Sequence, residues 1–305
     1  MILVMGSQSE PMVTRVRDEL ARRGAESFFV SSHDMPGTVQ VGVSPGAGGF
    51  LRLSDDRRIS MSEVSAVYQR LGFHDAEMYQ DYSAEERQYA NTECLAACNV
   101  LLDAMPGRVV NPPHTSGSNA SKPYQIGLIA PHGFRTPRTL VTNRPDQALA
   151  FYELLEGQVI YKSISYLRSI VQVMQPADLE RLDTLGSCPV QLQERVDGTD
   201  IRVHVVGDDV LFPSIIQAEE SDYRYDKSAE ITEHALPPEI ERACFAVTRA
   251  LGFLMAGIDL RVTPEGEYYC FEVNPSPAFT WYEDRTGQPI TAALCDLLQS
   301  LGARP

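Results

Sequence analysis

The chain opens with hydrophobic and polar positions in the order of a strand, a helix and a strand. An apolar run at 2–5 is followed by a polar turn and an amphipathic stretch at 11–23, and a second apolar-rich run covers 26–31. From 83 to 104, apolar residues recur at helical spacing after a Ser-x-x-Glu capping box, which predicts a long helix. Between them the pattern predicts a hairpin and one more strand, at 50–53 with 58–61 and at 64–68.

A second unit follows the turn-forming segment Asn111-Pro112-Pro113-His114, so we place the first domain boundary at 114. Helical spacing predicts helices at 118–129, 145–155, 237–251 and 289–301. Apolar runs and alternation predict strands at 159–162, 190–195, 201–206, 210–216, 255–262 and 268–273. Strands mixed with helices in this way predict an α/β protein.

Composition and charge narrow the class of protein. With 305 residues and 43% hydrophobic content, the chain can fill the cores of two or three subdomains. Its 41 acidic and 26 basic residues give a net charge of −15, which argues against nucleic acid or an anionic membrane as a partner. No apolar run approaches the ~20 residues of a membrane span and no signal peptide is recognisable, so we expect a cytoplasmic protein. We expect its six cysteines to be buried free thiols.

Three oxygen-bearing side chains occur on two neighbouring predicted strands. Asp259 lies in Gly257-Ile258-Asp259-Leu260, and Glu272 and Asn274 are two residues apart on the next strand. Residues at this spacing face the same side, so the three can converge if the strands pair. Such hard ligands suit Mg²⁺. The alternative is an acidic, solvated strand end, which the apolar alternate positions disfavour.

Cations suited to phosphate binding are few. Lys162 ends the strand Val159-Ile160-Tyr161, Lys122 lies in a predicted helix, and Arg202 alternates with Asp200 on a strand. Ammonium and guanidinium groups at such places can bind planar or phosphate oxyanions. Taken alone, each is more typical of a solvated surface cation, and only the surrounding sequence favours phosphate binding.

The segment from Gln191 to Gly207 joins a strand, an Asp-Gly turn and a second strand in an order that resembles the ATP-grasp fold, and within it the RimK-like branch. The resemblance implies an α/β ATP-grasp fold preceded by an N-terminal α/β (pre-ATP-grasp) domain. It also implies that Gln193, the backbone of Glu194 and Val196 contact adenine, while Asp200 takes the ribose hydroxyls. The expected division is an N-terminal domain (1–114), a central ATP-grasp subdomain with the phosphate loop (115–189) and a C-terminal ATP-grasp subdomain with the metal site (190–305).

The likeness extends over about two thirds of the chain and is similar to graspetide, or microviridin-type, ligases, which macrocyclise ribosomal peptides. The matching segments are Asn111-Pro112-Pro113, Lys122-Pro123-Tyr124-Gln125, 137–143, Tyr161-Lys162, Gln217, Asp222-Tyr223-Arg224, Leu236-Pro237, Glu272-Val273-Asn274-Pro275 and 286–290. Three features depart from the pattern: the loop at 163–169 lacks glycine, Tyr223 stands where the family often has Trp, and Asn274-Pro275 is followed by Ser276-Pro277 and not by a turn that contains glycine.

The resemblance implies ATP and Mg²⁺ as cofactors and an acyl phosphate intermediate. Lys122 and Lys162 would bind the phosphates, and Arg202, Arg224 and Lys162 would carry catalysis; an ion pair with a neighbouring aspartate is the alternative for Arg224. The implied partner is a precursor peptide with a leader segment, whose surface we expect at 38–70 or 176–188. A RimK-like ligase that adds an amino acid, or a nucleotide-binding partner without activity, are the alternatives, and the intact metal set disfavours the latter. A homodimer is left open.

Overall fold

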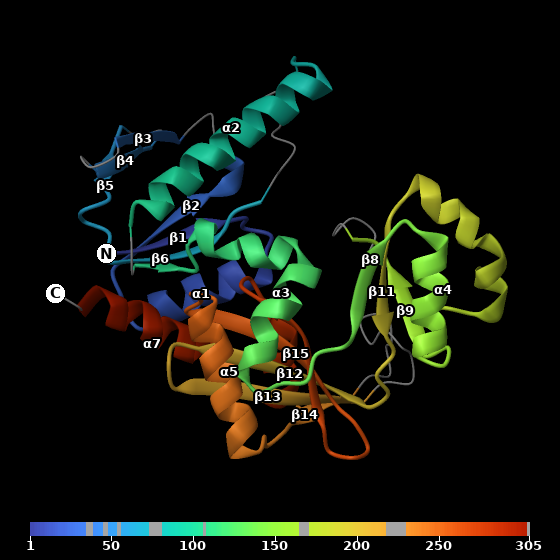
Figure 1. Cartoon of the computed structure of the whole chain (residues 1–305). Helices are drawn as coiled ribbons and strands as arrows, with labels where there is room; N and C mark the ends of the chain where they lie inside the picture. Colours follow the sequence, from blue (N-terminus) through green and yellow to red (C-terminus); the bar gives the residue numbers. More distant parts are fainter. Residues whose placement is uncertain are drawn as a thin grey trace.

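Three sheet-containing bodies make up the computed structural model (Figure 1). The structure describes residues 1–34, 39–44, 48–53, 56–72, 81–105, 108–164, 171–217 and 230–303. In the figure the N-terminal body lies at the upper left, the central body at the right and the C-terminal sheet at the bottom. An α/β chain was predicted, and the mixed helix and sheet architecture confirms it.

The N-terminal body is a parallel sheet covered on both faces. Its strands, in spatial order, are β2 (Ser27–Ser31), β1 (Ile2–Gly6), β6 (Ala66–Arg70) and β7 (Val109–Val110). Alternate residues of β1 enter different cores: Ile2 and Val4 pack toward α1 (Pro11–Arg22), whereas Leu3 and Met5 pack toward α2 (Ala84–Asp103). Burial on both faces explains why this strand is apolar throughout.

Sequence and structure agree closely here. The strand–helix–strand opening is confirmed, and α2 begins with the predicted capping box, in which Ser83 and Glu86 bond each other's backbone amides. The predicted hairpin is confirmed as β4 (Gly48–Arg52) paired with β5 (Arg58–Ser60). A further strand that was not predicted, β3 (Gln40–Ser44), pairs with β4 and contacts α2.

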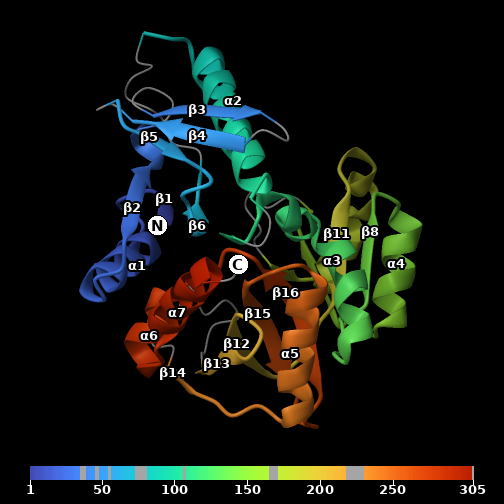
Figure 2. The same ribbon diagram turned by 90° about the vertical axis from the view of Figure 1, so that its left-hand side faces the viewer.

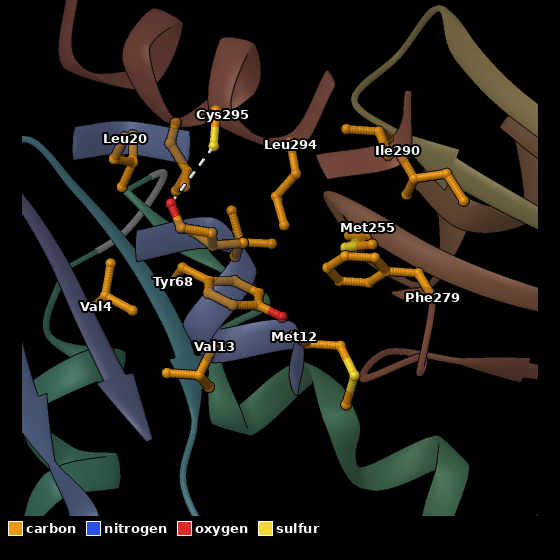
Figure 3. Packing of buried hydrophobic residues seen from close by; sticks show 14 of the residues in the cluster. Val4, Met12, Val13, Leu20, Tyr68, Met255, Phe279, Ile290, Leu294 and Cys295 are labelled. Carbon is orange, nitrogen blue, oxygen red and sulfur yellow. Dashed lines mark hydrogen bonds between the residues drawn. The ribbon is translucent and has the colours of Figure 1, made fainter. Parts of the chain in front are cut away.

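The C-terminal helix α7 (Ile290–Ala303) joins the first and last parts of the chain. It contacts α1, β1 and β6 of the N-terminal body and also the C-terminal sheet (Figure 2). In the shared core, Leu294 and Cys295 lie near Tyr68 of β6, and Met255 lies near Phe279 (Figure 3). The two bodies therefore share one hydrophobic core rather than a polar interface.

The central body is a small antiparallel sheet with one apolar face. Its strands, in spatial order, are β10 (Gln172–Val173), β9 (Val159–Lys162), β11 (Val190–Glu194) and β8 (Thr139–Thr142). Helix α4 (Pro145–Leu154) and a 3-10 segment, Pro176–Ser187, cover the face that carries Val159 and Leu192. The predicted domain boundary between residues 189 and 190 lies directly before β11, the strand that pairs with both β8 and β9 in this sheet.

The C-terminal body is a five-stranded antiparallel sheet. Its strands, in spatial order, are β14 (Glu230–Glu233), β13 (Val210–Gln217), β12 (Thr199–Val206), β15 (Met255–Val262) and β16 (Tyr268–Asn274). Helices α5 (Pro238–Ala250) and α3 (Lys122–Ile129) pack on the face that buries Val203, Ile258 and Val273. The alternate residues, which are mostly polar, face the other way.

Three predictions need correction. The helix predicted at 118–129 is two pieces, the 3-10 segment Pro113–Ala120 and then α3, because Pro123 favours a fresh helix start. The short helix α6 (Thr280–Thr286) was not predicted. Among the cysteines, Cys188 is exposed and Cys94 is half-buried, so the expectation of six buried thiols was wrong for these two.

No helix in the described ranges is long and apolar enough to cross a membrane.

Candidate active site

The uncovered face of the central sheet carries polar side chains from two paired strands. Lys162 of β9 stands opposite Gln191 of β11, and its ammonium donates to Oε1 of Gln193 at 3.1 Å. The Nε2 of Gln193 in turn donates to Thr139 of β8 at 3.0 Å. Gln191 is buried, and its amide has no hydrogen-bond partner in the part of the chain that the structure describes. This face is therefore polar, preorganised around Lys162 and able to accept more hydrogen bonds.

The environment of Lys162 favours a weakly hydrated ammonium. Burial lowers the pKa of Lys162 to about 8, and the charge of Lys122 also lowers it, whereas Glu272 raises it. These three charges therefore lie close enough to influence one another, although they come from the central sheet, α3 and β16. An ammonium in such a place gains most from an added anion.

Asp259, Glu272 and Asn274 lie on the polar face of β15 and β16. Asp259 and Glu272 are opposite each other in the strand register, and the next pair is Leu260 with Cys270, so Phe271 is an extra residue on β16 at this irregularity. The structure therefore brings the two carboxylates together. The amide oxygen of Asn274, two residues beyond Glu272, accepts a hydrogen bond from the Ser276 amide at 2.8 Å.

Each of these carboxylates is paired with a cation. Lys122 Nζ lies 2.9 Å from Glu272 Oε2, and Arg202 Nη1 lies 2.5 Å from Asp259 Oδ1. The side chain of Arg202 is 8% exposed, so its charge is held in place by the sheet around it. No cluster of three His, Cys, Asp or Glu residues is found in the described ranges, and the set here is two carboxylates and an amide. Hard oxygen donors of this kind fit Mg²⁺.

The residues expected to contact adenine and ribose lie where β11 passes into β12. The side chain of Glu194 bonds Arg138, and its backbone amide donates to the Arg138 carbonyl at 2.8 Å. Val196 is buried, and its amide makes no hydrogen bond to any described residue. Asp200 at the start of β12 is bound by Arg261. Arg224 lies outside the described residues, as do Asp222 and Tyr223.

Comparison with known proteins decides the family. The RimK-like ATP-grasp domain matches residues 120–298. The chain belongs to the RimK-like ATP-grasp family. It is an ATP-grasp ligase.

Three proteins are similar to this ATP-grasp ligase in sequence or in fold. A probable alpha-L-glutamate ligase of Pseudoalteromonas translucida (strain TAC 125) is 25% identical over 215 residues, which are 66% of this chain and 71% of that protein. The ATP-grasp ligase PsnB, complexed with minimal precursor, Mg and ADP, is 26% identical, with a TM-score of 0.83 over 99% of this chain and 98% of PsnB. The macrocyclase MdnC from Microcystis aeruginosa MRC, bound with precursor peptide MdnA, shares the fold at 22% identity, with a TM-score of 0.85 over 98% of this chain and 99% of MdnC.

In this ATP-grasp ligase, two buried amides hold β16 in place. This strand carries Glu272 and Asn274, two of the residues expected to bind Mg²⁺, and is called the metal strand below. Gln125 of α3 pairs with both backbone groups of Val273: its Nε2 donates to the carbonyl at 2.8 Å, and its Oε1 accepts from the amide at 3.0 Å. Asn111 joins the residue after this strand to the start of β15, because its Oδ1 accepts from the Leu254 amide and its Nδ2 donates to the carbonyls of Met255 and Pro275. Both residues lie in segments that resemble the family, but nothing in the sequence shows these partners.

Gly257 leaves room for the guanidinium of Arg202. A Cβ at this position would lie 2.1 Å from Arg202 Nη2 and 2.6 Å from the Pro277 side chain. A side chain at position 257 would therefore displace the guanidinium from its place beside Asp259. His204, two residues farther along β12, is fully buried, and burial and the charge of Arg202 hold its pKa well below the usual value. It packs against Tyr282 as a neutral ring, with centroids 4.9 Å apart.

A cavity of about 420 Å³ adjoins the metal strand from the N-terminal side. Its lining includes Ser9, Glu10, Arg70 and Ser276. Arg70 Nε lies 2.5 Å from Glu10, and its Nη1 donates to Ser276 Oγ at 2.9 Å and to the Pro277 carbonyl at 3.1 Å. The Ser276 amide also donates to Asn274, so hydrogen bonds connect Arg70 of the N-terminal body to one of the residues expected to bind Mg²⁺.

Proposed function

We propose that this ATP-grasp ligase macrocyclises a ribosomally made precursor peptide by joining a side-chain carboxylate to an amine or hydroxyl of the same peptide. The observation that supports this most is the match to PsnB, which extends over 99% of this chain. The likeness to a ligase solved with a precursor peptide thus includes nearly all of this chain.

The nucleotide would lie between the polar face of the central sheet and the polar face of the C-terminal sheet. Gln193, the backbone of Glu194 and the amide of Val196 would contact adenine, and Asp200 would accept hydrogen bonds from the ribose hydroxyls. Lys122 and Lys162 would bind the phosphates, which suits the partly buried position of Lys162. In this scheme Lys122 exchanges the Glu272 carboxylate for a phosphate oxygen.

Asp259, Glu272 and Asn274 would hold Mg²⁺, which supplies positive charge beside the reacting phosphates when it is bound. Arg202 would keep its guanidinium at the same place, because Gly257 and Asp259 fix it there. The contribution of these residues is electrostatic: they stabilise negative charge that develops during phosphoryl transfer.

The reaction would proceed in two steps. A carboxylate oxygen of the peptide forms a bond to the γ-phosphorus while the bond to the β–γ bridging oxygen breaks, which gives an acyl phosphate and ADP. An amine or hydroxyl then bonds to the acyl carbon, loses its proton and expels phosphate. One water is removed from the peptide for each bond. A nucleophile on the same peptide has a high effective concentration, which favours a ring over hydrolysis.

Peptide binding would use two regions. Arg224 is proposed to hold the substrate carboxylate or acyl phosphate, since a guanidinium matches both through two hydrogen bonds. The cavity beside Arg70 gives room for a substrate side chain next to the metal strand. A leader segment bound elsewhere would offset repulsion between an acidic core peptide and a protein of net charge −15.

The alternative is addition of an amino acid to a carboxylate, as the names of the alpha-L-glutamate ligase relatives suggest. Both functions would use the same nucleotide and metal residues. They differ only in what captures the acyl phosphate.

Mass spectrometry separates the two. The protein is incubated with ATP, Mg²⁺ and synthetic peptides rich in Asp or Glu together with Ser, Thr or Lys, each made with and without an N-terminal leader. We expect the loss of one water mass per bond, with one ADP released for each. A mass gain equal to an added amino acid would support the alternative. Glu272→Gln should abolish either product, whereas Glu265→Gln, an exposed acid in the turn of the same hairpin, should not.

A further inference from the structure

Four charged residues form a square on the polar face of β12 and β15. Asp200 and Arg202 alternate on β12, while Asp259 and Arg261 alternate on β15. In the register, Asp200 faces Arg261 and Arg202 faces Asp259, so the sign alternates both along and across the strands. Three of the four have a place in the proposed nucleotide and metal site. Arg261 has none so far.

The guanidinium of Arg261 makes three well-formed hydrogen bonds. Its Nε and Nη2 donate to the two oxygens of Asp200 at 2.7 and 2.9 Å, a two-point pairing that fixes the plane of the carboxylate. Its Nη1 donates to the Val196 carbonyl at 2.8 Å. The guanidinium also lies over the Phe271 ring, with Cζ 5.5 Å from the centroid. One side chain thus ties the β11–β12 turn to the strand that carries Asp259.

The turn itself is built to lie against this strand. Gly198 has a φ of 152°, and a Cβ there would lie 2.2 Å from the Val262 carbonyl oxygen and 3.1 Å from Arg261 Cγ. Glycine therefore permits the close approach of the turn to β15. With its carbonyl bound by Arg261, Val196 keeps an amide that bonds no described residue.

We propose that Arg261 is a positioning residue for the nucleotide, which acts by presenting Asp200 to the ribose and the Val196 amide to the adenine. A carboxylate has about four lone-pair positions, so a two-point pairing with one guanidinium leaves one on each oxygen for a hydroxyl donor. Arg261 sets the direction of those two. The proposal rests on the adenine and ribose assignment made under the proposed function.

The ribose hydroxyls offer a test that a merely structural residue would not affect. Dissociation constants for ATP and 2′-deoxy-ATP, both with Mg²⁺, are measured by calorimetry in wild type and in Arg261→Met, which keeps the length of the side chain and removes its donors. We expect wild type to prefer ATP, and the variant to bind ATP roughly 10- to 100-fold more weakly with the preference reduced toward one. A partly unfolded variant would weaken both nucleotides equally and leave their ratio unchanged.

Two further variants complete the test. Asp200→Asn should lose the preference to the same extent, and the double variant Asp200→Asn with Arg261→Met should lose no more, because the two residues act through one contact. Arg249→Met, which removes an exposed ion pair with Asp208 in the same body, should keep the wild-type ratio.

Three results would overturn the proposal. Asp200→Asn could lose the preference for ATP over 2′-deoxy-ATP while Arg261→Met keeps it. In that case Asp200 would contact the ribose, but Arg261 would not position it. Equal binding of the two nucleotides by wild type would overturn it as well. Retention of the preference in Asp200→Asn would show that the ribose lies elsewhere. The proposed ligase reaction is tested apart from all three, by product formation with ATP.

Discussion

Gln125 offers a direct test of how the metal strand is held. It lies on α3, three residues after Lys122, and is fully buried. Its side chain bonds both backbone groups of Val273, which stands between Glu272 and Asn274 on the edge strand β16. Replacement by leucine keeps a similar volume but leaves a buried amide and a buried carbonyl without partners.

The cost follows from those two groups. An unsatisfied buried backbone group costs about 1–3 kcal/mol, so Gln125→Leu should lose about 2–5 kcal/mol of unfolding free energy and lower the Tm by on the order of 5–10 °C. Because Val273 separates two proposed metal ligands, the Mg²⁺ concentration for half-maximal ATP turnover should rise by about 10-fold or more, as is usual when residues that orient ligands are lost. Calorimetry and ADP release as a function of Mg²⁺ measure the two effects.

Tyr124 provides the matched control, since it is the adjacent residue on the same helix and is 62% exposed. Tyr124→Leu should change neither the Tm nor the Mg²⁺ requirement appreciably. A Gln125→Leu protein with wild-type Tm would refute the reasoning on buried amides. A lower Tm with an unchanged Mg²⁺ requirement would show that Val273 does not position the metal ligands.

Three further predictions concern the charged residues. Asp259→Asn and Glu272→Gln should each lower ATP turnover by on the order of 100-fold or more without unfolding, measured by ADP release and circular dichroism. Because burial lowers the pKa of Lys162 to about 8, its ammonium loses its proton as the pH rises through that value, so calorimetry should show ATP affinity falling above pH ~8 in wild type and a flatter profile in Lys162→Met. Gly257→Ala should displace the Arg202 guanidinium and lower turnover by on the order of 10-fold or more, whereas unchanged turnover would mean that the position of Arg202 is unimportant.

The sequence alone predicted those parts of the fold and site that depend on the local spacing of apolar and polar residues. The alternation in 255–262 and 268–273 identified two strands with one apolar and one polar face, and the structure confirms both as β15 and β16. The same alternation placed Glu272 and Asn274 on one side. The pairing of Glu272 opposite Asp259 needed only that neighbouring strands with a short turn pair antiparallel, which is the common case.

Contacts that depend on register or on distant segments could not be predicted in this way. Arg261 looks like any strand arginine until the register places it opposite Asp200. Gln125 and Val273 are 148 residues apart, and no local pattern connects them. The helix α6 is only seven residues long, too short for periodicity to distinguish it from a loop.

The charge arrangement gives a physical reason why the site is stable before any ligand enters. A cluster of carboxylates in a chain of net charge −15 would repel itself, yet Glu272 is paired with Lys122, Asp259 with Arg202 and Asp200 with Arg261. Removing one partner of a partly buried pair leaves an uncompensated charge, so Lys122 would not leave the Glu272 carboxylate for phosphate unless another cation replaced it. Nucleotide binding and Mg²⁺ binding should therefore depend strongly on each other: in calorimetry, ATP without Mg²⁺ and Mg²⁺ without ATP should each bind far more weakly than the two together. Equal affinity for ATP with and without Mg²⁺ would mean that Lys122 does not exchange Glu272 for phosphate in this way.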